Sequence, residues 1–176
     1  LWGVNTFISP YLTEVVGVPE EWIAAVLLLL GVGATIGIFI GGRLADLRPI
    51  ETLRYSYPLL ALVCCAIYFL APTGMWVGIA VVALLGLPIT LVATTVQNRV
   101  LIGAKAAPDL ASTLISSVFN IGTATGSWIS AGALATGLAY AQLPLISIGA
   151  AIIASVLAFV VTARDRREAT DAAPAS

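Results

Sequence analysis

Hydroxyl and amide side chains recur at helical spacing inside long apolar segments of this 176-residue chain. The most polar of these segments, residues 109–137, carries six such side chains at steps of three or four: Thr113, Ser116, Asn120, Thr123, Ser127 and Ser130. That spacing aligns them along one face of an α-helix. Such side chains form hydrogen bonds with neutral polar groups and, in apolar surroundings, need partners. The stripe is therefore predicted to face protein or water.

Asn120 is the most informative residue of this stripe, because a carboxamide brings two donors and an acceptor into an apolar segment. Two interpretations stay open. In one, the amide makes a structural hydrogen bond to another helix, which is worth about 1 kcal/mol or less in membranes. In the other, the amide contacts a polar substrate.

Two other segments repeat the pattern, one near the start of the chain and one around residues 90–97. Polar stripes on three segments that are not consecutive predict a shared cavity. Its candidate substrate-lining residues are Trp2, Asn5, Ser9, Thr90, Thr94, Gln97 and Asn120. Pro88 removes a backbone hydrogen bond from the helix that carries Thr90, which predicts either a gating bend or a static kink.

The residue types that catalysis needs are missing from these segments. The chain has no histidine, and its apolar segments contain no carboxylate pair and no metal-ligand spacing. No glycine-rich loop joins a strand to a helix, as a phosphate-binding loop requires. Glu14 lies near the end of its apolar segment, which favours a wetted interface over a proton site. We therefore expect no enzyme activity, no metal and no cofactor.

The amino-acid composition indicates whether these segments lie in water or in a lipid bilayer. Hydrophobic residues make up 60% of the chain and charged residues 10%, whereas a soluble domain has about 25% charged residues. Eight basic residues in small clusters do not form a nucleic-acid footprint, and the adjacent Cys64 and Cys65 are expected to pack within an apolar run. The chain is therefore predicted to be an integral membrane protein in a lipid bilayer.

Six runs with few or no charges approach the length of about 20 residues that crosses a bilayer core. They cover residues 1–16, 22–42, 55–70, 75–96, 109–137 and 143–163. The predicted fold is an all-α transmembrane bundle of six helices over residues 1–164, followed by a polar cytoplasmic tail at residues 165–176. Because the chain opens at Leu1, already in apolar sequence, we expect a piece of a longer protein.

Basic residues orient these spans, since Lys and Arg accumulate in short cytoplasmic loops. Threading six spans alternately through a membrane places all of them on one side: Arg43, Arg48, Arg54, Arg99, Lys105, Arg164, Arg166 and Arg167. The opposite loops hold acids such as Glu20 and Glu21. A missed or invented span would scatter the basic residues over both sides, so the pattern supports six spans and a cytoplasmic carboxyl terminus.

Small and polar residues distinguish helices that pack on protein from helices that face lipid, because helices in lipid associate through close backbone approach and polar contacts. Glycines spaced four residues apart predict close helix packing at Gly33, Gly37, Gly41, Gly122 and Gly126. Residues 55–70 and 143–163 carry few polar groups and are expected to face lipid.

The segment that follows residue 41 resembles a known loop motif. Gly42-Arg43-Leu44-Ala45-Asp46-Leu47-Arg48 is similar to the cytoplasmic motif of the major facilitator superfamily, Gly-x-Leu-Ala-Asp-Arg-x-Gly-Arg. Leu47 replaces a basic residue and Pro49 the second glycine, which fits the degraded copy that the family carries between its eighth and ninth helices. Ser9-Pro10-Tyr11-Leu12 and Phe119-Asn120-Ile121-Gly122 resemble helices seven and eleven of its drug and sugar efflux carriers, among them arabinose-efflux-like bacterial proteins.

This resemblance implies the carboxyl-terminal half of a twelve-helix secondary transporter, whose partner is a missing amino-terminal six-helix half. It implies a bacterial inner-membrane protein that exports small organic molecules, drugs or sugars, in exchange for protons by alternating access. In the family, the aspartate corresponding to Asp46 stabilises the inward-closed packing by facing a helix amino terminus of the other half. Gly42, Arg43 and Asp46 then form a conformational-switch loop, with Arg99 as the candidate partner of Asp46.

One alternative belongs to a different class: a complete six-span structural or channel-like membrane protein without coupled transport. Six further spans upstream of Leu1 with a stronger copy of the motif favour the carrier, whereas an initiator methionine just before Leu1 favours the alternative. The residues leave the substrate, the direction of transport and the coupling ion open, because amides, hydroxyls and aromatic rings suit sugars and drugs alike.

Overall fold

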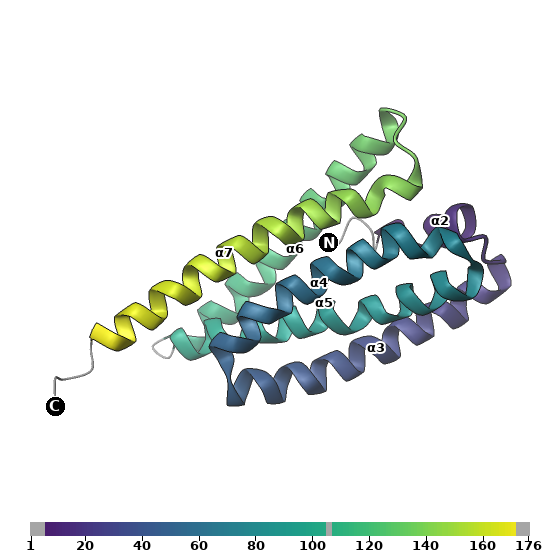
Figure 1. Ribbon diagram of the computed structural model, residues 1–176. Coiled ribbons are helices and arrows are strands. Elements are labelled where there is room, and N and C mark those ends of the chain that lie inside the picture. The colour runs from purple at the N-terminus through teal and green to yellow at the C-terminus, as the bar shows by residue number, and fades with distance from the viewer. Residues whose placement is uncertain (1–5, 105–106, 172–176) are drawn as a thin grey trace.

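The computed structural model describes residues 6–104 and 107–171, and that part of the chain contains only helices and turns. A short α2 (Ile8–Tyr11) runs directly into a π-helix (Leu12–Val16). The long helices are α3 (Glu20–Leu47), α4 (Pro49–Leu70), α5 (Met75–Gly103), α6 (Pro108–Ala135) and α7 (Leu143–Asp171), with short 3-10 helices at Ala71–Thr73 and Tyr140–Gln142. Figure 1 shows them as an elongated bundle. The prediction of an all-α membrane bundle is confirmed.

Proline and glycine mark the helix boundaries. Pro49 and Pro108 stand at the start of α4 and α6, where a backbone N–H has no helical partner and its absence costs nothing. Gly17 and Gly137 adopt left-handed backbone conformations, with φ of 75° and 95°, beyond the π-helix and beyond α6. The chain reverses direction at these boundaries, so successive long helices run antiparallel (Figure 1).

Because the helices alternate in direction, the ends of α3, α5 and α7 lie at the same end of the bundle as the starts of α4 and α6 (Figure 1). Seven arginines belong to these helix ends, which we call the basic end: Arg43, Arg48, Arg54, Arg99, Arg164, Arg166 and Arg167. The one-sided distribution of basic residues is thus a feature of the fold. The assignment of this end to the cytoplasm stays a prediction.

Four stretches of the described residues are long and apolar enough to cross a membrane: Glu20–Leu47, Pro49–Thr73, Met75–Gly103 and Tyr140–Arg164. Helix α6 has the length, but its hydroxyl and amide side chains make it less apolar than these four. The first predicted span begins outside the described residues and continues as α2 and the π-helix. Membrane spans at residues 1–16 and 109–137 therefore stay predictions.

Several helices extend beyond the predicted membrane spans. Helix α3 continues to Leu47 and α4 starts at Pro49, so Arg48 alone separates helices where a loop over residues 43–54 was expected. The expected tail is helical as far as Asp171. Charged residues end a membrane span without ending a helix, because Arg, Lys and Glu are good helix formers.

A glycine ridge on α3 brings its backbone against α5. The ridge contains Gly33, Gly37 and Gly41, the three glycines whose spacing predicts close packing. A Cβ atom at Gly33 would lie 2.7 Å from the Ala83 carbonyl oxygen, and one at Gly41 would lie 3.1 Å from Leu91 Cα. Such close approach of backbones is the usual basis of helix association in lipid.

Gly86 of α5 also lies against the backbone of α3, whereas Gly122 of α6 has no close neighbour. A Cβ atom at Gly86 would meet the Leu30 carbonyl oxygen and lie 2.8 Å from the Ala34 nitrogen, both on α3. At Gly122 nothing lies within 4 Å of a Cβ position. No described helix of this chain lies against Gly122, so close packing at Gly122 stays a prediction. Close packing at Gly126, half-buried on the same helix, also stays a prediction.

Helix α4 supplies much of the core, although its low polarity predicts a lipid-facing helix. Leu60, Val63, Cys64 and Ile67 are each at most 3% exposed. The Tyr11 hydroxyl donates to the Ile67 carbonyl oxygen at 3.3 Å, which ties the first segment to the end of α4. Helix α4 contacts both α5 and α7. A helix that touches lipid still has an inner face, so low polarity alone did not reveal the buried side of α4.

Candidate functional site

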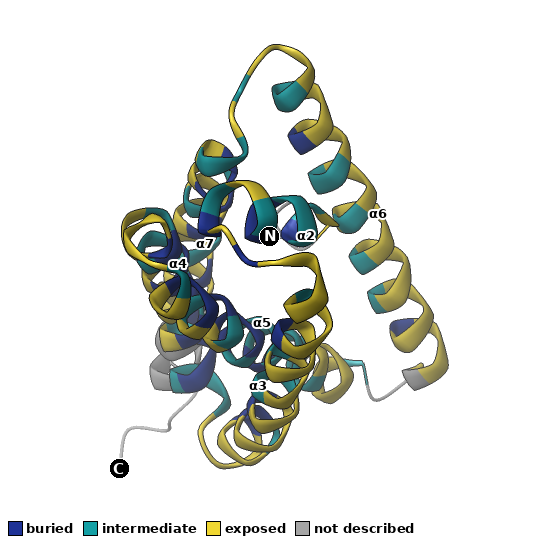
Figure 2. Cartoon of the chain, turned by 90° about the vertical axis from the view of Figure 1, so that its right-hand side faces the viewer, coloured by how far each residue is buried: buried dark blue, intermediate teal, exposed yellow. Residues whose placement is uncertain are grey.

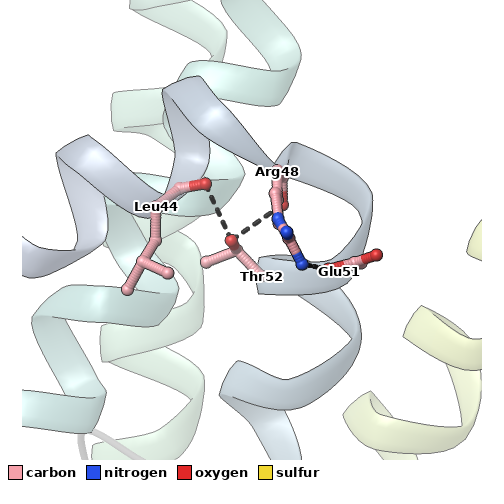
Figure 3. A network of polar contacts seen from close by, with 4 residues as sticks. All are labelled: Leu44, Arg48, Glu51 and Thr52. Carbon is pink, nitrogen blue, oxygen red and sulfur yellow. Dashed lines mark hydrogen bonds and ion pairs between the residues drawn. The ribbon is translucent and has the colours of Figure 1, made fainter.

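A compact polar network holds the turn between α3 and α4 (Figure 3). The Thr52 hydroxyl donates a hydrogen bond shared between the carbonyl oxygens of Leu44, at 2.9 Å, and Arg48, at 2.8 Å. Arg48 Nη1 donates to Glu51 Oε2 at 3.1 Å in an exposed ion pair, and such pairs contribute about 0 to 1 kcal/mol. Thr52 is buried. It therefore fixes the end of α3 to the start of α4 more firmly than the ion pair does.

Asp46, on the last turn of α3, is joined to α5 by a hydrogen bond. Its Oδ1 accepts from Asn98 Nδ2 at 2.9 Å, and the carboxylate is otherwise exposed at the basic end. Gly42 and Arg43 precede it on the same helix, half-buried and exposed respectively. The pairing of Asp46 with Arg99 stays a prediction. The sequence did not single out Asn98, although it lies between two residues that were singled out.

Two predicted cavity residues of α5 lie at the interface with α3. The Thr90 hydroxyl donates to the Ala34 carbonyl oxygen of α3 at 2.8 Å, and it is one of the atoms that a Cβ at Gly37 would meet. The Thr94 hydroxyl donates to the Thr90 carbonyl oxygen at 2.7 Å within its own helix. Both hydroxyls are satisfied without a ligand, so this geometry favours a packing role for them.

Replacing Thr90 by valine is expected to lower stability modestly and to leave substrate affinity unchanged. The change removes an interhelical hydrogen bond, which is worth about 0.6 kcal/mol on average and up to about 1.7 kcal/mol in membranes. Thermal unfolding of the solubilised full-length protein measures the first effect and a ligand-binding assay the second. Thr90→Ser, which keeps the hydroxyl, is the matched control. Substrate affinity that falls in Thr90→Val and not in Thr90→Ser would assign Thr90 to the substrate cavity.

The remaining cavity candidates lie apart from one another. Ser9 lines a cavity of about 570 Å³ between the first segment and α3, beside Glu14. Gln97 and Asn120 are exposed on α5 and α6. Two further candidates lie outside the described residues: Trp2 and Asn5. The structure therefore does not gather the described candidates into one polar cavity.

Helix α6 carries the longest polar stripe and stands away from α3 and α4, with most of its residues exposed (Figure 2). Ser130 is an exception at 2% exposure. The oxygen atoms of the Ser127 and Thr6 hydroxyls lie 2.9 Å apart and share a hydrogen bond, which connects the stripe to the first segment. Most of the stripe is exposed within this chain, and its orientation toward protein or water stays a prediction. Thr6 was missed because its type is common and its partner is distant in sequence.

An apolar groove that the sequence did not predict lies toward the basic end, between α4, α5, α6 and α7. It consists of two adjoining cavities of about 410 and 500 Å³. The two cavities share four lining residues: Tyr57, Val96, Val100 and Ala154. No sequence pattern singled out these four residues. They come together only because the fold places α4, α5 and α7 side by side.

Comparison with curated proteins finds relatives that are named as transporters. An inner membrane transport protein of Escherichia coli (strain K12), YdhP, is 33% identical over 160 residues, which are 91% of this chain and 41% of that protein. A chloramphenicol resistance protein of Streptomyces lividans is 32% identical over 131 residues, 73% of this chain and 33% of that protein. The MFS-type transporter YtbD of Bacillus subtilis (strain 168) is 33% identical over 130 residues, 72% of this chain and 33% of that protein.

These matches cover most of this chain and less than half of each relative. The chain spans between 33% and 41% of the length of the curated relatives described above. No family model matches the chain. All three names describe transport or drug resistance, and none describes an enzyme.

Proposed function

This chain belongs to the major facilitator superfamily of membrane transporters, and we propose that it forms the carboxyl-terminal half of a secondary transporter that exports small organic molecules. The amino-terminal half is the implied partner, and the two halves rock about a midplane site in alternating access. The bacterial inner membrane is the proposed location, with the basic end and the carboxyl terminus in the cytoplasm.

The observation that carries this proposal is the turn between α3 and α4. Its residues resemble a degraded copy of the family motif, the Thr52 hydroxyl bonds its backbone, and its Asp46 accepts a hydrogen bond from Asn98 of α5. Helices α3 and α5 are also packed backbone to backbone. Asp46 is thus held on a rigid pair of helices. Its proposed contact with the other half can then form or break in one step when the two halves rock.

Export and proton coupling rest on two further considerations. One relative is named for chloramphenicol resistance, and export of a drug is a direct route to resistance. The long helices of this chain carry their carboxylates at or near helix ends, as at Glu20, Asp46 and Asp109. The proposed coupling carboxylate therefore lies in the amino-terminal half.

The test is accumulation of chloramphenicol and of a panel of sugars in cells that express the full-length reading frame, with and without a protonophore. We expect accumulation to be lower than in cells without the protein and to rise when the proton gradient collapses. Equal accumulation across the whole panel, with the protein present in the membrane, would count against export and favour a non-transporting six-helix protein.

A further inference from the structure

We propose that the groove between α4, α5, α6 and α7 binds an acyl chain of an anionic phospholipid, with the lipid headgroup at Arg99. The groove is distinct from the polar stripes on α5 and α6 and from the turn between α3 and α4. Its two cavities have volumes of about 410 and 500 Å³ and adjoin each other.

The groove exists because small residues occupy facing positions on three helices. They are Ala93 of α5, Gly122 of α6, and Ala150 and Ala154 of α7. Nothing lies within 4 Å of a Cβ position at Gly122, so the space is not filled by a neighbouring side chain. Larger lining residues such as Val118 and Phe119 make the walls apolar. Walls of this kind favour a hydrocarbon chain over a polar substrate.

The depth of the groove matches one leaflet of a membrane. Along α5 its lining runs from Ile89 to Gly103, which is about 21 Å at 1.5 Å per residue. A bilayer is about 40 to 45 Å thick including its headgroup regions, so one leaflet with its headgroups occupies about 20 to 22 Å. The groove therefore reaches from the basic end to about the middle of the membrane, where an acyl chain of that leaflet ends.

The groove opens at the basic end of the bundle, and this opening, which we call its mouth, is lined by an arginine. Arg99 lines the cavity nearest the basic end, together with Leu53, Gly103 and Val161. A guanidinium presents paired N–H donors that fit a phosphate in a bidentate manner. Basic pockets between membrane helices on the cytoplasmic side are typical sites for anionic lipid headgroups. The apolar groove thus complements the acyl chain of an anionic phospholipid, and Arg99 at its mouth complements the headgroup.

A second cation lies next to this mouth. Arg54 follows Leu53 on α4, and its guanidinium lies 4.1 Å from the ring centroid of Phe159 on α7. Among the described residues, Arg54 Nε is buried without a hydrogen-bond partner. The two arginines add positive potential at the leaflet surface where the headgroup would rest.

The test is retention of lipid by the full-length protein, extracted from membranes and measured by native mass spectrometry. The probes are phosphatidylglycerol and phosphatidylcholine with the same acyl chains. We expect the wild type to retain phosphatidylglycerol in preference. Arg99→Gln should reduce that preference about fivefold. Ala154→Leu, which narrows the groove where the two cavities meet, should reduce retention of both lipids, and Arg48→Gln, which removes an exposed arginine of the same end, should change neither.

Four outcomes would overturn the proposal. One is equal retention of both lipids by the wild type, and another is unchanged retention in both Arg99→Gln and Ala154→Leu. Displacement of the lipid by soluble glycerol phosphate would assign Arg99 to a free anion instead. If Ala154→Leu alters the KM for export while retention stays as in the wild type, the occupant is the transported molecule. Because lipid retention does not depend on transport, failure of the export assay leaves this test intact.

Discussion

Asp46→Asn is expected to slow transport about tenfold while the protein still inserts and folds. The carboxylate lies exposed on the last turn of α3, so its loss leaves no buried charge unpaired. Asn98 can still donate to the new amide oxygen, but the bond is no longer to an anion, and bonds to charged groups are worth about 1.5 to 3 kcal/mol. The same loss of charge weakens the proposed contact of Asp46 with the other half of the transporter. Because only one conformation makes that contact, a weakening of about 1.4 kcal/mol shifts the two-state equilibrium tenfold. Initial rates of export from loaded vesicles measure the effect.

Glu51→Gln is the matched control for this variant. It also removes one carboxylate from the basic end, but that carboxylate is in an exposed pair with Arg48 that contributes about 0 to 1 kcal/mol. We expect its transport rate to stay close to that of the wild type. Equal loss in both variants would point to a general effect of charge at this end, and no loss in Asp46→Asn would remove the switch role from the loop.

Features that depend on a single helix could be predicted from the sequence. Glycines four residues apart lie on one face of any α-helix, so the packing face of α3 follows from its own residues. The polar stripe of α6 follows in the same way. The clustering of basic residues at one end needs only the alternation of helix direction, because every second connection then falls on the same side.

Features that depend on which helix is the neighbour could not be predicted. A hydroxyl inside a membrane helix is equally suited to a substrate and to a backbone carbonyl, so the spacing of Thr90 did not reveal its bond to Ala34. The apolar groove depends on small residues of three helices, and an alanine in an apolar run carries no sign of the residue that it faces. Pairing of Asp46 with Asn98 likewise depends on how far α3 and α5 are offset.

Gly37→Leu is expected to prevent correct assembly of the bundle. A Cβ atom at Gly37 would meet the Leu87 carbonyl oxygen and the Thr90 hydroxyl. The carbonyl belongs to a helix backbone and cannot rotate away, so α3 and α5 must separate. Overpacking costs about 1 to 3 kcal/mol and occasionally more, and separation also breaks the Thr90 bond to Ala34. The fraction of monodisperse protein in mild detergent and its unfolding temperature should both fall sharply.

Gly31→Leu introduces the same side chain on the same helix at a position where nothing lies within 4 Å of a Cβ atom. Glycine is about 0.8 to 1 kcal/mol less favourable than alanine in a helix interior, and leucine ranks just below alanine. This variant should therefore be as stable as the wild type or slightly more so. The two substitutions therefore have opposite expected signs, although hydrophobicity and propensity change equally in both. If Gly37→Leu were as stable as Gly31→Leu, α3 and α5 would not be held at backbone distance. The stiffness assigned to the unit that carries Asp46 would then have to come from the Thr52 network alone.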